Sequence, residues 1–484
     1  MSGTIFRFWA LVCLAAAPAF AQIAMTPFSA SLAGITTDTA VREEREPKPD
    51  FGREIEANKS HAIPAAEIVG FQFLLNRFDR AHFGCCDYNV TMDTVRRNLR
   101  SSWVVDRDPF TVNQLGHPYQ GSMYHGFARS AGLNFWESWG YTFLGSAVWE
   151  IAGESTLPSR NDQIATGIGG AFLGESLFRL SNLVLEHDAL PAWLRELGAA
   201  AISPPTGFNR HAFGDRFRRP FPSRDPIYFT RLQVGASTSD KGNVGPSQTG
   251  LHRNEALADF YIDYGLPGKK DYDYSRPFDY FSLQATTSSA NGFENVMTHG
   301  TLVAKGYDVG KNYRGIVGLY GSYDYIAPQT FRVSSTALSL GTTAQYRITE
   351  LMQLLGTARL GLGYTAVGTI RSSAENDFHY GVTPQALASL RLIFGGRAAI
   401  DVTGREYYVS RVAAADRGGH ENIIRMDAAL TVRVYKRHGI TIKFLGNRRD
   451  ANYPDIGSVR QERNTVGFFY TLLGHDRFGA ADWD

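Results

Sequence analysis

Cysteine is scarce in this chain, which has 3 cysteines among its 484 residues. Cys13 lies in an apolar stretch at the N-terminus, so only Cys85 and Cys86 remain beyond it. Two adjacent cysteines either form a strained disulfide or stay as buried thiols. Their spacing suggests neither a metal site nor cysteine catalysis.

Long apolar runs and an excess of one charge are also missing. Although 43% of the residues are hydrophobic, no run of about 18 apolar residues follows the N-terminal stretch, which argues against a helical membrane span. The formal net charge is +2, from 49 Lys and Arg against 47 Asp and Glu. So small a charge indicates neither nucleic acid nor an acidic partner. We expect no nucleic acid partner and no cofactor.

The N-terminus has the features of a secretory signal peptide. Arg7 precedes an apolar run over residues 8–17, and a short stretch of small residues ends at Ala21. This order predicts a signal peptide over residues 1–21, and therefore an exported protein. Cys13 lacks the small residue that would precede a lipidated cysteine, so no lipid anchor is expected.

The second half of the chain alternates apolar and polar residues with a period of two, from about residue 227 to residue 473. The clearest segment places Leu430 and Val432 on one face, with Asp427 and Thr431 on the other. Segments of about ten residues with this pattern fit strands of a barrel that spans a bilayer. We count about twelve such segments, an even number as bacterial barrels require. The 23 Tyr, 31 Phe and 49 Gly suit aromatic girdles and small inward-facing residues.

A soluble β-sandwich is the competing interpretation, because its strands would also alternate. It fits less well, since a soluble sheet turns its polar side outward and seldom keeps charged residues off the apolar face over so many segments. The sequence thus predicts an α+β protein, with an N-terminal periplasmic helical domain followed by an antiparallel transmembrane β-barrel of about twelve strands. The expected divisions are a signal peptide (1–21), a flexible polar leader (22–62), the helical domain (63–222) and the outer-membrane barrel (223–484).

Connections between the predicted strands alternate in length. Short ones fall at residues 349–350, 395–397 and 436–438. Long ones fall at residues 240–254, 326–334, 369–383, 411–421 and 447–461. Outer-membrane barrels have short periplasmic turns and long outer loops. We therefore expect the protein in the outer membrane, with both termini in the periplasm.

One face of each predicted strand carries polar residues that would line the barrel interior. The charged members of this set are Arg231, Asp259, Asp263, Lys305, Arg347, Arg359, Arg391, Asp401, Arg405, Arg425, Asp427, Arg433 and Lys443. Basic residues outnumber acidic ones, which would suit a small anionic solute if the lumen is open. The alternative is a lumen filled by mutually paired side chains, and a barrel of about twelve strands is narrow enough for either.

The helical domain is predicted from long apolar-rich stretches before the barrel. Two long helices are expected near residues 122–152 and 159–185. Gly167, Gly170 and Gly174 lie on neighbouring turns of the second, where missing side chains would let another helix approach closely. We therefore expect a compact helical domain.

A series of short strings runs through this domain over roughly residues 102–210. The strings are Asp-Arg-Asp-Pro-Phe at 106–110, Asn-Gln at 113–114, His-Pro-Tyr-Gln-Gly at 117–121, Ala-Arg-Ser at 128–130, Gly-Ser at 145–146 with Trp-Glu at 149–150, Pro-Ser-Arg-Asn-Asp at 158–162, Gly-Glu at 174–175 and Asn-Arg at 209–210. With this series the chain resembles an uncharacterised bacterial family, a domain of unknown function. The resemblance implies that these polar positions belong together, and it implies no activity or substrate.

His117 is the best candidate for chemistry in this domain. A histidine near Glu150 or Glu154 could act as a general base oriented by a carboxylate. The simpler interpretation is a structural, hydrogen-bonded histidine, which we favour because the sequence places no nucleophile beside it. Ser122, the nearest hydroxyl, is expected first as a helix N-cap.

The acidic residues near His117 also have structural interpretations. Glu150 and Glu154 share a helical face, and with one histidine they make too weak a signal for a metal site, so no metal is expected. We expect them instead to hold loops or Arg210 through charge-assisted hydrogen bonds. The candidate catalytic residues are His117, Glu150, Glu154 and Asp162.

Two pairs of residues have the spacing of common helix contacts. Ser159 and Asp162 fit a capping box, in which the serine side chain accepts from the backbone and the acidic group reaches back. Glu175 and Arg179 lie four residues apart, which ordinarily gives a salt bridge on a helix surface.

Two functions follow from these features. The first is a non-enzymatic outer-membrane barrel with a periplasmic helical domain, acting in envelope structure, transport or partner binding. The second is an outer-membrane lipid-modifying enzyme, a phospholipid or lipopolysaccharide acyl hydrolase that uses His117 with Glu150 or Glu154. We favour the first, because no GxSxG elbow surrounds a usable serine. The expected partners are outer-membrane lipids and the barrel-assembly machinery.

Overall fold

The computed structural model describes most of the chain beyond residue 57. The described residues are 58–83, 86–219, 221–240, 253–269, 272–328, 331–368, 374–412, 419–474, 477–481 and 483. The predicted signal peptide, nearly all of the predicted leader and Cys85 lie outside this set.

The described residues of the C-terminal half form one closed barrel of 12 antiparallel strands. Each strand pairs with its neighbours in sequence, and β1 closes the barrel by pairing with β12. The strands are β1 (Tyr228–Ser239), β2 (Arg253–Tyr264), β3 (Phe281–Ser288), β4 (Asn295–Val309), β5 (Tyr313–Ile326), β6 (Val333–Arg347), β7 (Met352–Gly368), β8 (Phe378–Phe394), β9 (Ala398–Val409), β10 (His420–Tyr435), β11 (His438–Tyr453) and β12 (Gly457–Leu473). The predicted antiparallel barrel of about twelve strands is confirmed.

The alternation in sequence separates the two faces of the barrel wall. On β10, the side chain of Leu430 lies on the outer face and is 43% exposed. The next residue, Thr431, is buried on the inner face, where its hydroxyl lies 2.9 Å from that of Thr441. Successive side chains of a strand point to opposite faces, so the period of two in the sequence becomes an apolar outside and a polar inside.

Strand β4 departs from this pattern at a bulge. The register with β5 shifts between Thr301 and Val303, so Lys305 pairs with Val317, whose side chain is exposed on the outer face. The prediction that Lys305 lines the interior is therefore wrong. One extra residue in a strand exchanges its two faces, and the sequence pattern does not reveal where that residue is inserted.

The connections differ at the two ends of the barrel. The turns from β6 to β7, from β8 to β9 and from β10 to β11 are short, as predicted, and lie at the end where β1 begins. At the other end, the predicted long connection over residues 447–461 is wrong, because β11 and β12 stay paired as far as Tyr453 and Gly457. Asp450 holds this polar extension, accepting hydrogen bonds from Arg448 and Arg460, both at 2.7 Å.

Before the barrel, the described residues form a bundle of helices. The helices are α3 (Ala62–Phe83), α4 (Met92–Arg100), α5 (His117–Ser130), α6 (Phe135–Ala152), α7 (Arg160–Ile164), α8 (Gly170–Leu185), α9 (Ala192–Ile202) and α10 (Pro204–Ala212). Two π-helical turns, η2 (Val112–Gly116) and η3 (Ala165–Gly169), lead into α5 and α8.

The predicted long helix over residues 122–152 is two helices. Gly132 has a φ of +88° directly after α5, and Asn134 begins α6 in a capping box with Glu137. A glycine in the left-handed region commonly ends a helix, and the capping box starts the next one. The predicted helix over residues 159–185 is interrupted only by the π-helical turn η3.

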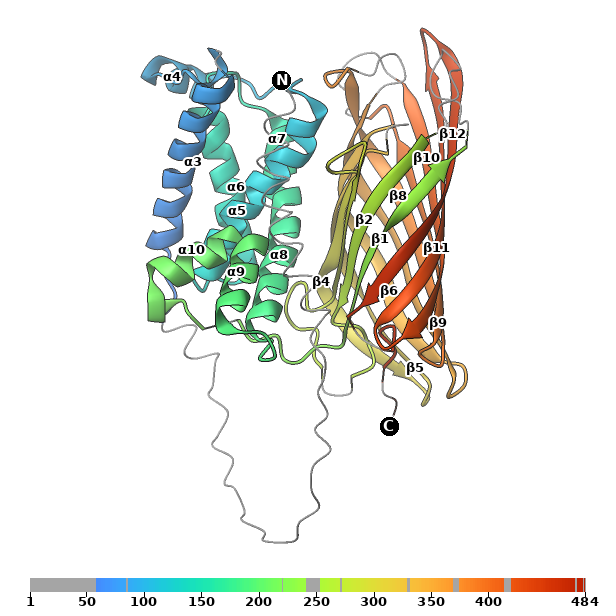
Figure 1. Ribbon diagram of the computed structural model, residues 1–484. Coiled ribbons are helices and arrows are strands. Elements are labelled where there is room, and N and C mark those ends of the chain that lie inside the picture. The colour runs from blue at the N-terminus through green and yellow to red at the C-terminus, as the bar shows by residue number, and fades with distance from the viewer. Residues whose placement is uncertain are drawn as a thin grey trace, which may run out of the picture.

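The helical bundle lies along the outer wall of the barrel, with its helices roughly upright beside the strands (Figure 1). Helix α8 runs between the other helices and strands β3 to β5, and most of its residues are buried. Gly321 of β5 leaves room for the ring of Phe172. Ser176 Oγ of α8 lies 2.6 Å from Thr298 Oγ1 of β4. Apolar and polar contacts therefore join the bundle to the wall.

Close helix packing depends on glycine at one crossing of the bundle. A Cβ atom at Gly170 would lie 2.6 Å from the Cα atom of Gly121, so α8 and α5 touch through their backbones. A Cβ atom at Gly174 would lie 2.8 Å from His125. These contacts agree with the close helix approach expected from the glycine spacing.

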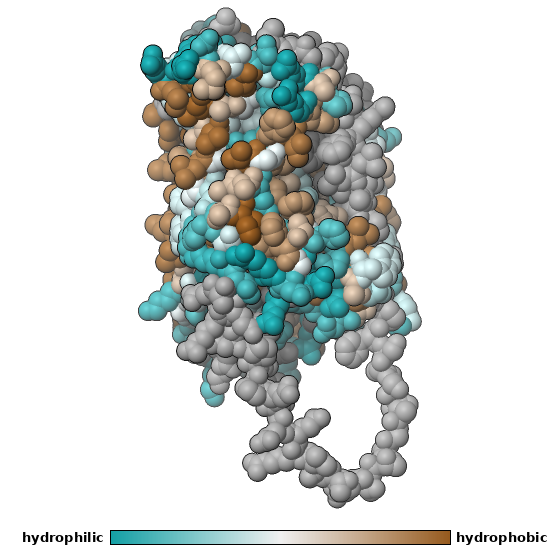
Figure 2. All heavy atoms as spheres, turned by 90° about the vertical axis from the view of Figure 1, so that its left-hand side faces the viewer, coloured by the Kyte–Doolittle hydropathy of each residue, from teal (hydrophilic) through white to brown (hydrophobic). Residues whose placement is uncertain are grey.

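The surface of the bundle that faces away from the barrel carries large apolar side chains over its middle part (Figure 2). On α3, Val69, Phe73 and Leu74 are 61%, 58% and 66% exposed, and Leu144 of α6 is 66% exposed. Charged residues gather toward the two ends of the bundle. Taken singly, none of the described helices has both the length and the apolar character that a membrane crossing requires.

The described residues after β12 fold against the inner wall at the end where β1 begins. Gln345 holds them, because its Oε1 accepts the backbone N–H of Ala481 at 3.0 Å and its Nε2 donates to the carbonyl of Gly479 at 3.2 Å. Trp483 Nε1 donates to Gln353 Oε1 at 3.1 Å. Phe478 is 1% exposed. This segment narrows one mouth of the barrel.

Candidate functional site

His117 is positioned by the two π-helical turns. One of them ends directly before His117, and the other contains Thr166. Such turns within helices are frequent at functional sites. The ring Nδ1 of His117 lies 3.1 Å from Thr166 Oγ1, and Nε2 lies 4.0 Å from Asp162 Oδ1. Because the second distance exceeds a hydrogen bond, Asp162 faces the ring without holding it.

Ser159 caps α7, since its Oγ accepts the backbone N–H of Asp162 at 3.2 Å. The expected return contact differs, because the backbone N–H of Ser159 donates to Glu150 Oε2 at 2.8 Å. In a capping box the Asp162 carboxylate would accept the backbone N–H of Ser159, and here Glu150 accepts it instead. The Asp162 carboxylate turns toward His117 instead.

Asn161 is the hub of the hydrogen bonds around this group. Its Oδ1 accepts the backbone N–H of Asp106 at 2.8 Å, and its Nδ2 donates to Asp162 Oδ1 at 2.9 Å. The same amide donates to the hydroxyl of Tyr380 at 2.9 Å, and Gln114 Nε2 donates to that hydroxyl at 2.8 Å. Tyr380 belongs to β8, so a residue of the barrel wall completes a polar cluster of the bundle.

Glu154 lies just beyond the end of α6. Its carboxylate accepts hydrogen bonds from Trp149 Nε1 at 2.7 Å and from Thr156 Oγ1 at 3.2 Å. Burial raises the pKa of Glu154 to about 7, with His117 opposing this shift and Asp162 adding to it.

The pKa values of two further carboxyl groups are raised. Burial, reinforced by the charge of Asp106, raises the pKa of Asp108 to about 6. Burial also raises the pKa of Asp162, and Asp106 is again the next cause. Perturbed carboxyl groups in a buried cluster are candidates for a functional site, although structural networks shift pKa values too. The chemistry that this arrangement offers is proton uptake and release.

A nucleophile is harder to place near His117. Ser122 lies inside α5, where its Oγ donates to the carbonyl of Tyr119 at 2.6 Å, so the expectation that it caps the helix is wrong. Thr166 is 1% exposed. Within the part of the chain that the structure describes, no three His, Cys, Asp or Glu side chains are grouped to hold a metal ion.

The predicted site residues thus lie at one end of the bundle. His117, Glu150 and Asp162 are buried, and Glu154 is half-buried. Glu150 holds a loop, as expected, but Arg210 pairs with Glu196 at 2.6 Å and not with Glu150 or Glu154. That part of the expectation is wrong, because α10 folds back onto α9 and carries Arg210 with it.

A second polar cluster lies at the junction of bundle and barrel, centred on Glu175. Its carboxylate accepts from Arg129 Nε at 2.7 Å and Arg179 Nε at 2.8 Å, and lies 3.0 Å from His125 Nε2. The side chains of Glu175 and Arg179 are 0% and 2% exposed, so the predicted surface position of this salt bridge is wrong. Arg179 Nη1 also donates to Asp279 Oδ1 at 3.2 Å, beyond the end of β2.

Sequence reasoning missed several members of these clusters. Arg129 lies within the string Ala-Arg-Ser at 128–130, and this string was the sequence feature that could have identified it as a member of a cluster. Tyr380 and Asp279 come from the barrel half, where the period of two reveals only which face a residue occupies. Nothing in the sequence pairs either of them with the bundle.

The structure places the charged residues expected in the lumen, apart from Lys305, on the inner face of the wall. Many form pairs: Arg391 Nε donates to Asp401 Oδ1 of the neighbouring strand β9 at 2.6 Å, and Arg391 Nη1 reaches across the lumen to Asp263 Oδ2 of β2 at 3.2 Å. Arg231 of β1 donates to Asp401 of β9 at 3.1 Å. Lys443 lies near both Asp259 and Asp427, and Asp427 also lies near Arg405 and Arg425. Arg347 and Arg433 are half-buried near strand ends. The inner-face set is Arg231, Asp259, Asp263, Arg347, Arg359, Arg391, Asp401, Arg405, Arg425, Asp427, Arg433 and Lys443.

Residues 102–205 match a family model described as "Domain of unknown function (DUF3943)". The match covers all of the ordered strings except Asn-Arg at 209–210, so the predicted resemblance is confirmed. It includes His117, Glu150, Glu154 and Asp162 and stops before the barrel. No curated protein matches the sequence.

Solved structures similar to this chain include several outer-membrane proteins. The channel DcaP of Acinetobacter baumannii has 6% identity and a TM-score of 0.23, covering 51% of this chain and 96% of its own. An anion-selective porin from Comamonas acidovorans has 8% identity and a TM-score of 0.20, covering 51% and 98%. The translocator domain of the autotransporter NalP from Neisseria meningitidis has 13% identity and a TM-score of 0.23, covering 50% and 88%.

Proposed function

We propose that this chain is an integral outer-membrane protein in which the barrel and the helical bundle share one bilayer. The bundle has an inverted distribution of polarity. Glu175, Arg179 and Asp162 are buried in its interior, whereas Phe73 and Leu144 are 58% and 66% exposed on its surface. Water favours the opposite arrangement, and large exposed apolar patches mark contact with a protein or a membrane. This observation carries the proposal.

The barrel wall supports the same location. Its outer face carries Leu360, Leu362, Val432 and Phe468, each between 44% and 71% exposed. A closed barrel satisfies its backbone groups within the wall, which the hydrocarbon layer requires. An apolar band of about 25 Å is expected on such barrels.

The apolar surface of the bundle fits a layer of this thickness. On α3, residues 68–76 carry no charged side chain, a length of about 14 Å at the rise of a helix. On α6, residues 140–152 expose only uncharged side chains over about 20 Å. The polar sides of these helices turn inward, toward the buried clusters. The bundle would therefore sit in the lipid beside the wall, and not in the periplasm as the sequence alone led us to expect.

The side chains in the lumen favour a barrel that acts as an anchor, and they argue against an open pore. Arg391 joins Asp401 of the neighbouring strand to Asp263 across the lumen, and Arg449 pairs with Glu421 at 2.6 Å while both are almost fully buried. The segment containing Phe478 narrows one mouth. We infer that the barrel holds the bundle in the membrane, and that the bundle binds a lipid or a protein partner.

The orientation that we propose puts both ends of the barrel segment in the periplasm. Longer connections lie at the opposite end, as is typical of outer-membrane barrels. Thr111, near the His117 cluster, donates to Glu375 Oε2 at 2.9 Å, and Glu375 lies in the connection between β7 and β8. In this orientation the polar cluster lies near the outer surface of the membrane.

A nitroxide probe tests the shared bilayer. We would attach it to Leu144→Cys on the bundle, Leu430→Cys on the barrel wall, or Arg218→Cys near one end of the bundle, in full-length protein with Cys85 and Cys86 replaced by serine. In liposomes, the probes at residues 144 and 430 should collide more with oxygen than with a water-soluble nickel complex. The probe at residue 218 should show the reverse.

The three probes separate the parts of the proposal. A probe at residue 430 in lipid with the probe at residue 144 in water would place the bundle in the periplasm and leave the barrel inserted. Both probes in water would overturn membrane insertion as well.

A lipid-modifying enzyme is the second candidate function. The observation in its favour is that Glu154 and Asp108, with pKa values raised to about 7 and about 6, lie beside His117 in a bundle exposed to lipid. A proton acceptor at this place suits acyl hydrolysis, but a general base also needs a nucleophile within reach. Comparing outer-membrane lipids of cells with and without the protein tests it. An altered lipid species would favour the enzyme, and unchanged lipids would favour anchoring.

A further inference from the structure

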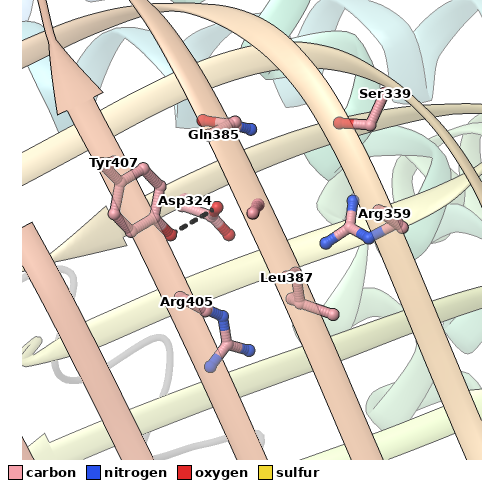
Figure 3. A pocket seen from close by; sticks show the side chains of 8 residues that line it. Asp324, Ser339, Arg359, Gln385, Leu387, Arg405 and Tyr407 are labelled. Carbon is pink, nitrogen blue, oxygen red and sulfur yellow. Dashed lines mark hydrogen bonds between the residues drawn. The ribbon is translucent and has the colours of Figure 1, made fainter.

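One cavity inside the barrel is lined by two arginines whose guanidinium groups are not fully hydrogen-bonded. Its lining comes from strands β5 to β9 and includes Asp324, Ser339, Arg359, Gln385, Arg405 and Tyr407. The empty space measures about 230 Å³. Figure 3 shows the guanidinium of Arg359 pointing toward the middle of this group, with Arg405 at its edge, while Asp324 turns toward Tyr407.

The guanidinium group of Arg359 is unsatisfied. The residue is 5% exposed, and its Nε and Nη1 atoms have no hydrogen-bond partner among the described residues. The ring of Tyr320 lies 5.8 Å from the guanidinium carbon, which is a weak compensation. The Nε atom of Arg405 also lacks a partner. Buried cationic donors without partners are costly, so this arrangement calls for an acceptor.

The nearby carboxylates are already engaged. Asp324 Oδ2 accepts the hydroxyl of Tyr407 at 2.8 Å. Asp427 lies 3.7 Å from Arg405, but it also lies 3.4 Å from Arg425 and 3.9 Å from Lys443. Asp427 is therefore shared by three cations and does not serve Arg405 alone.

We propose that this cavity is a binding site for one small inorganic anion, of the size of a halide, held by Arg359 and Arg405. Charge selects an anion, since the unpartnered groups are donors on cations. Size selects a small one, because the centre of the cavity has room for about one water-sized particle. The ion would complete the polar filling of the barrel. This site does not depend on whether the bundle lies in lipid.

Bromide provides a direct test, because it resembles chloride and scatters X-rays anomalously. Crystals of the full chain, grown in detergent and soaked in sodium bromide, should give an anomalous peak between Arg359 and Arg405. Bromide peaks confined to the protein surface, with none in the cavity, would overturn the proposal. This measurement uses the unaltered protein and holds even where a variant fails to fold.

Stability supplies the second measurement, on Arg359→Gln and a control variant. The temperature at which folded barrel converts to the unfolded gel band would be compared in bromide and gluconate at equal ionic strength. We expect wild type to convert several degrees higher in bromide, and Arg359→Gln to show no difference. Arg391→Gln is the matched control, because its guanidinium is paired with Asp263 and Asp401. It should be less stable yet keep the bromide effect.

Two other results would count against the site. A bromide effect that persists in Arg359→Gln would mean that the ion acts elsewhere. Sulfate would replace bromide in the same measurement. If sulfate raised the conversion temperature of wild type as much as bromide does, and had no effect on Arg359→Gln, the assignment to a halide-sized ion would be overturned.

Discussion

The hydroxyl of Tyr380 accepts a hydrogen bond from Asn161 Nδ2 at 2.9 Å, which joins the outer wall of the barrel to the hub of the polar cluster in the bundle. Gln114 donates to the same hydroxyl at 2.8 Å. The cluster that contains His117 is therefore complete only when the bundle is docked on the wall. Barrel and bundle are coupled through it.

Replacing Tyr380 by phenylalanine should weaken this coupling. Tyr380→Phe removes the acceptor of Gln114 and one of the two acceptors of the Asn161 amide, which we expect to cost about 1–3 kcal/mol. The bundle should become sensitive to protease at a lower temperature, while the gel migration of the heated barrel stays unchanged. Tyr364→Phe is the control, because the Tyr364 ring stacks on Tyr380 at 5.2 Å. Equal protease sensitivity of the two variants would contradict the role of the hydroxyl.

Much of the barrel could be predicted from sequence, because a strand whose two faces have different surroundings must show a period of two. Leu430 and Thr431 illustrate this, with one exposed outside and the other buried inside. Predictions from this pattern fail where a bulge or an ion pair changes a strand in a way that the period of two does not encode. A bulge turned Lys305 outward, and a cross-strand ion pair between Asp450 and Arg460 extended a hairpin that its polar sequence had suggested was a loop.

The candidate site was predictable only within the bundle. The strings around His117 and Asp162 mark residues that meet across the two π-helical turns. Which acceptor completes the cap of Ser159, and which tyrosine of the wall closes the cluster, depends on how the bundle docks. Docking is a contact between distant segments, for which a single sequence carries no local signal. The inverted polarity of the bundle was equally hidden until its helices were packed.

Substitutions of Asp162 and His117 distinguish a structural role of the polar cluster from a catalytic one. Asp162→Ala removes an acceptor of Asn161, so we expect less folded protein, with a cost of about 1–3 kcal/mol. His117→Ala should cost less, since His117 has one hydrogen-bond partner at 3.1 Å. Protein amount, membrane insertion and the lipid profile would be measured together. A His117→Ala protein that accumulates normally but changes the lipid profile as a deletion does would favour the enzyme.

The Glu175 cluster should be the more sensitive of the two. Glu175→Gln leaves Arg129 and Arg179 buried beside a neutral group, and breaking a buried ion pair typically costs about 3–5 kcal/mol. We expect the bundle to lose its protease resistance at ordinary temperature. Glu196→Gln is the matched control, because that carboxylate also pairs with an arginine but is 49% exposed. It should change stability by less than about 1 kcal/mol.

An arginine at position 430 tests the outer face of the barrel. Leu430→Arg should destabilise insertion by about 2–4 kcal/mol if the residue meets the middle of the bilayer. Thr431→Ser keeps the inner-face hydroxyl and should have little effect. The readout is the fraction of protein that shows heat-modifiable migration after refolding into liposomes. Similar losses in both variants would contradict an outer face at Leu430.

The raised pKa of Glu154 predicts a pH dependence of bundle stability. Its pKa moves from 4.5 to about 7 in the folded chain. Between these values the folded chain retains a proton that the unfolded chain has released, so stability falls as the pH rises through this window and levels off above it. Asp108, raised from 3.8 to about 6, acts in the same direction.

Trp149 reports on this titration, because its indole donates to Glu154 at 2.7 Å. Thermal unfolding of the bundle, followed by tryptophan fluorescence in detergent, should occur at a higher temperature at pH 5 than at pH 8. Glu154→Gln mimics the protonated group, so it should reduce this difference while Asp108 leaves a residual slope. A transition temperature that rises with pH in wild type would contradict a raised pKa, and an unchanged slope in Glu154→Gln would assign the effect to other carboxyl groups.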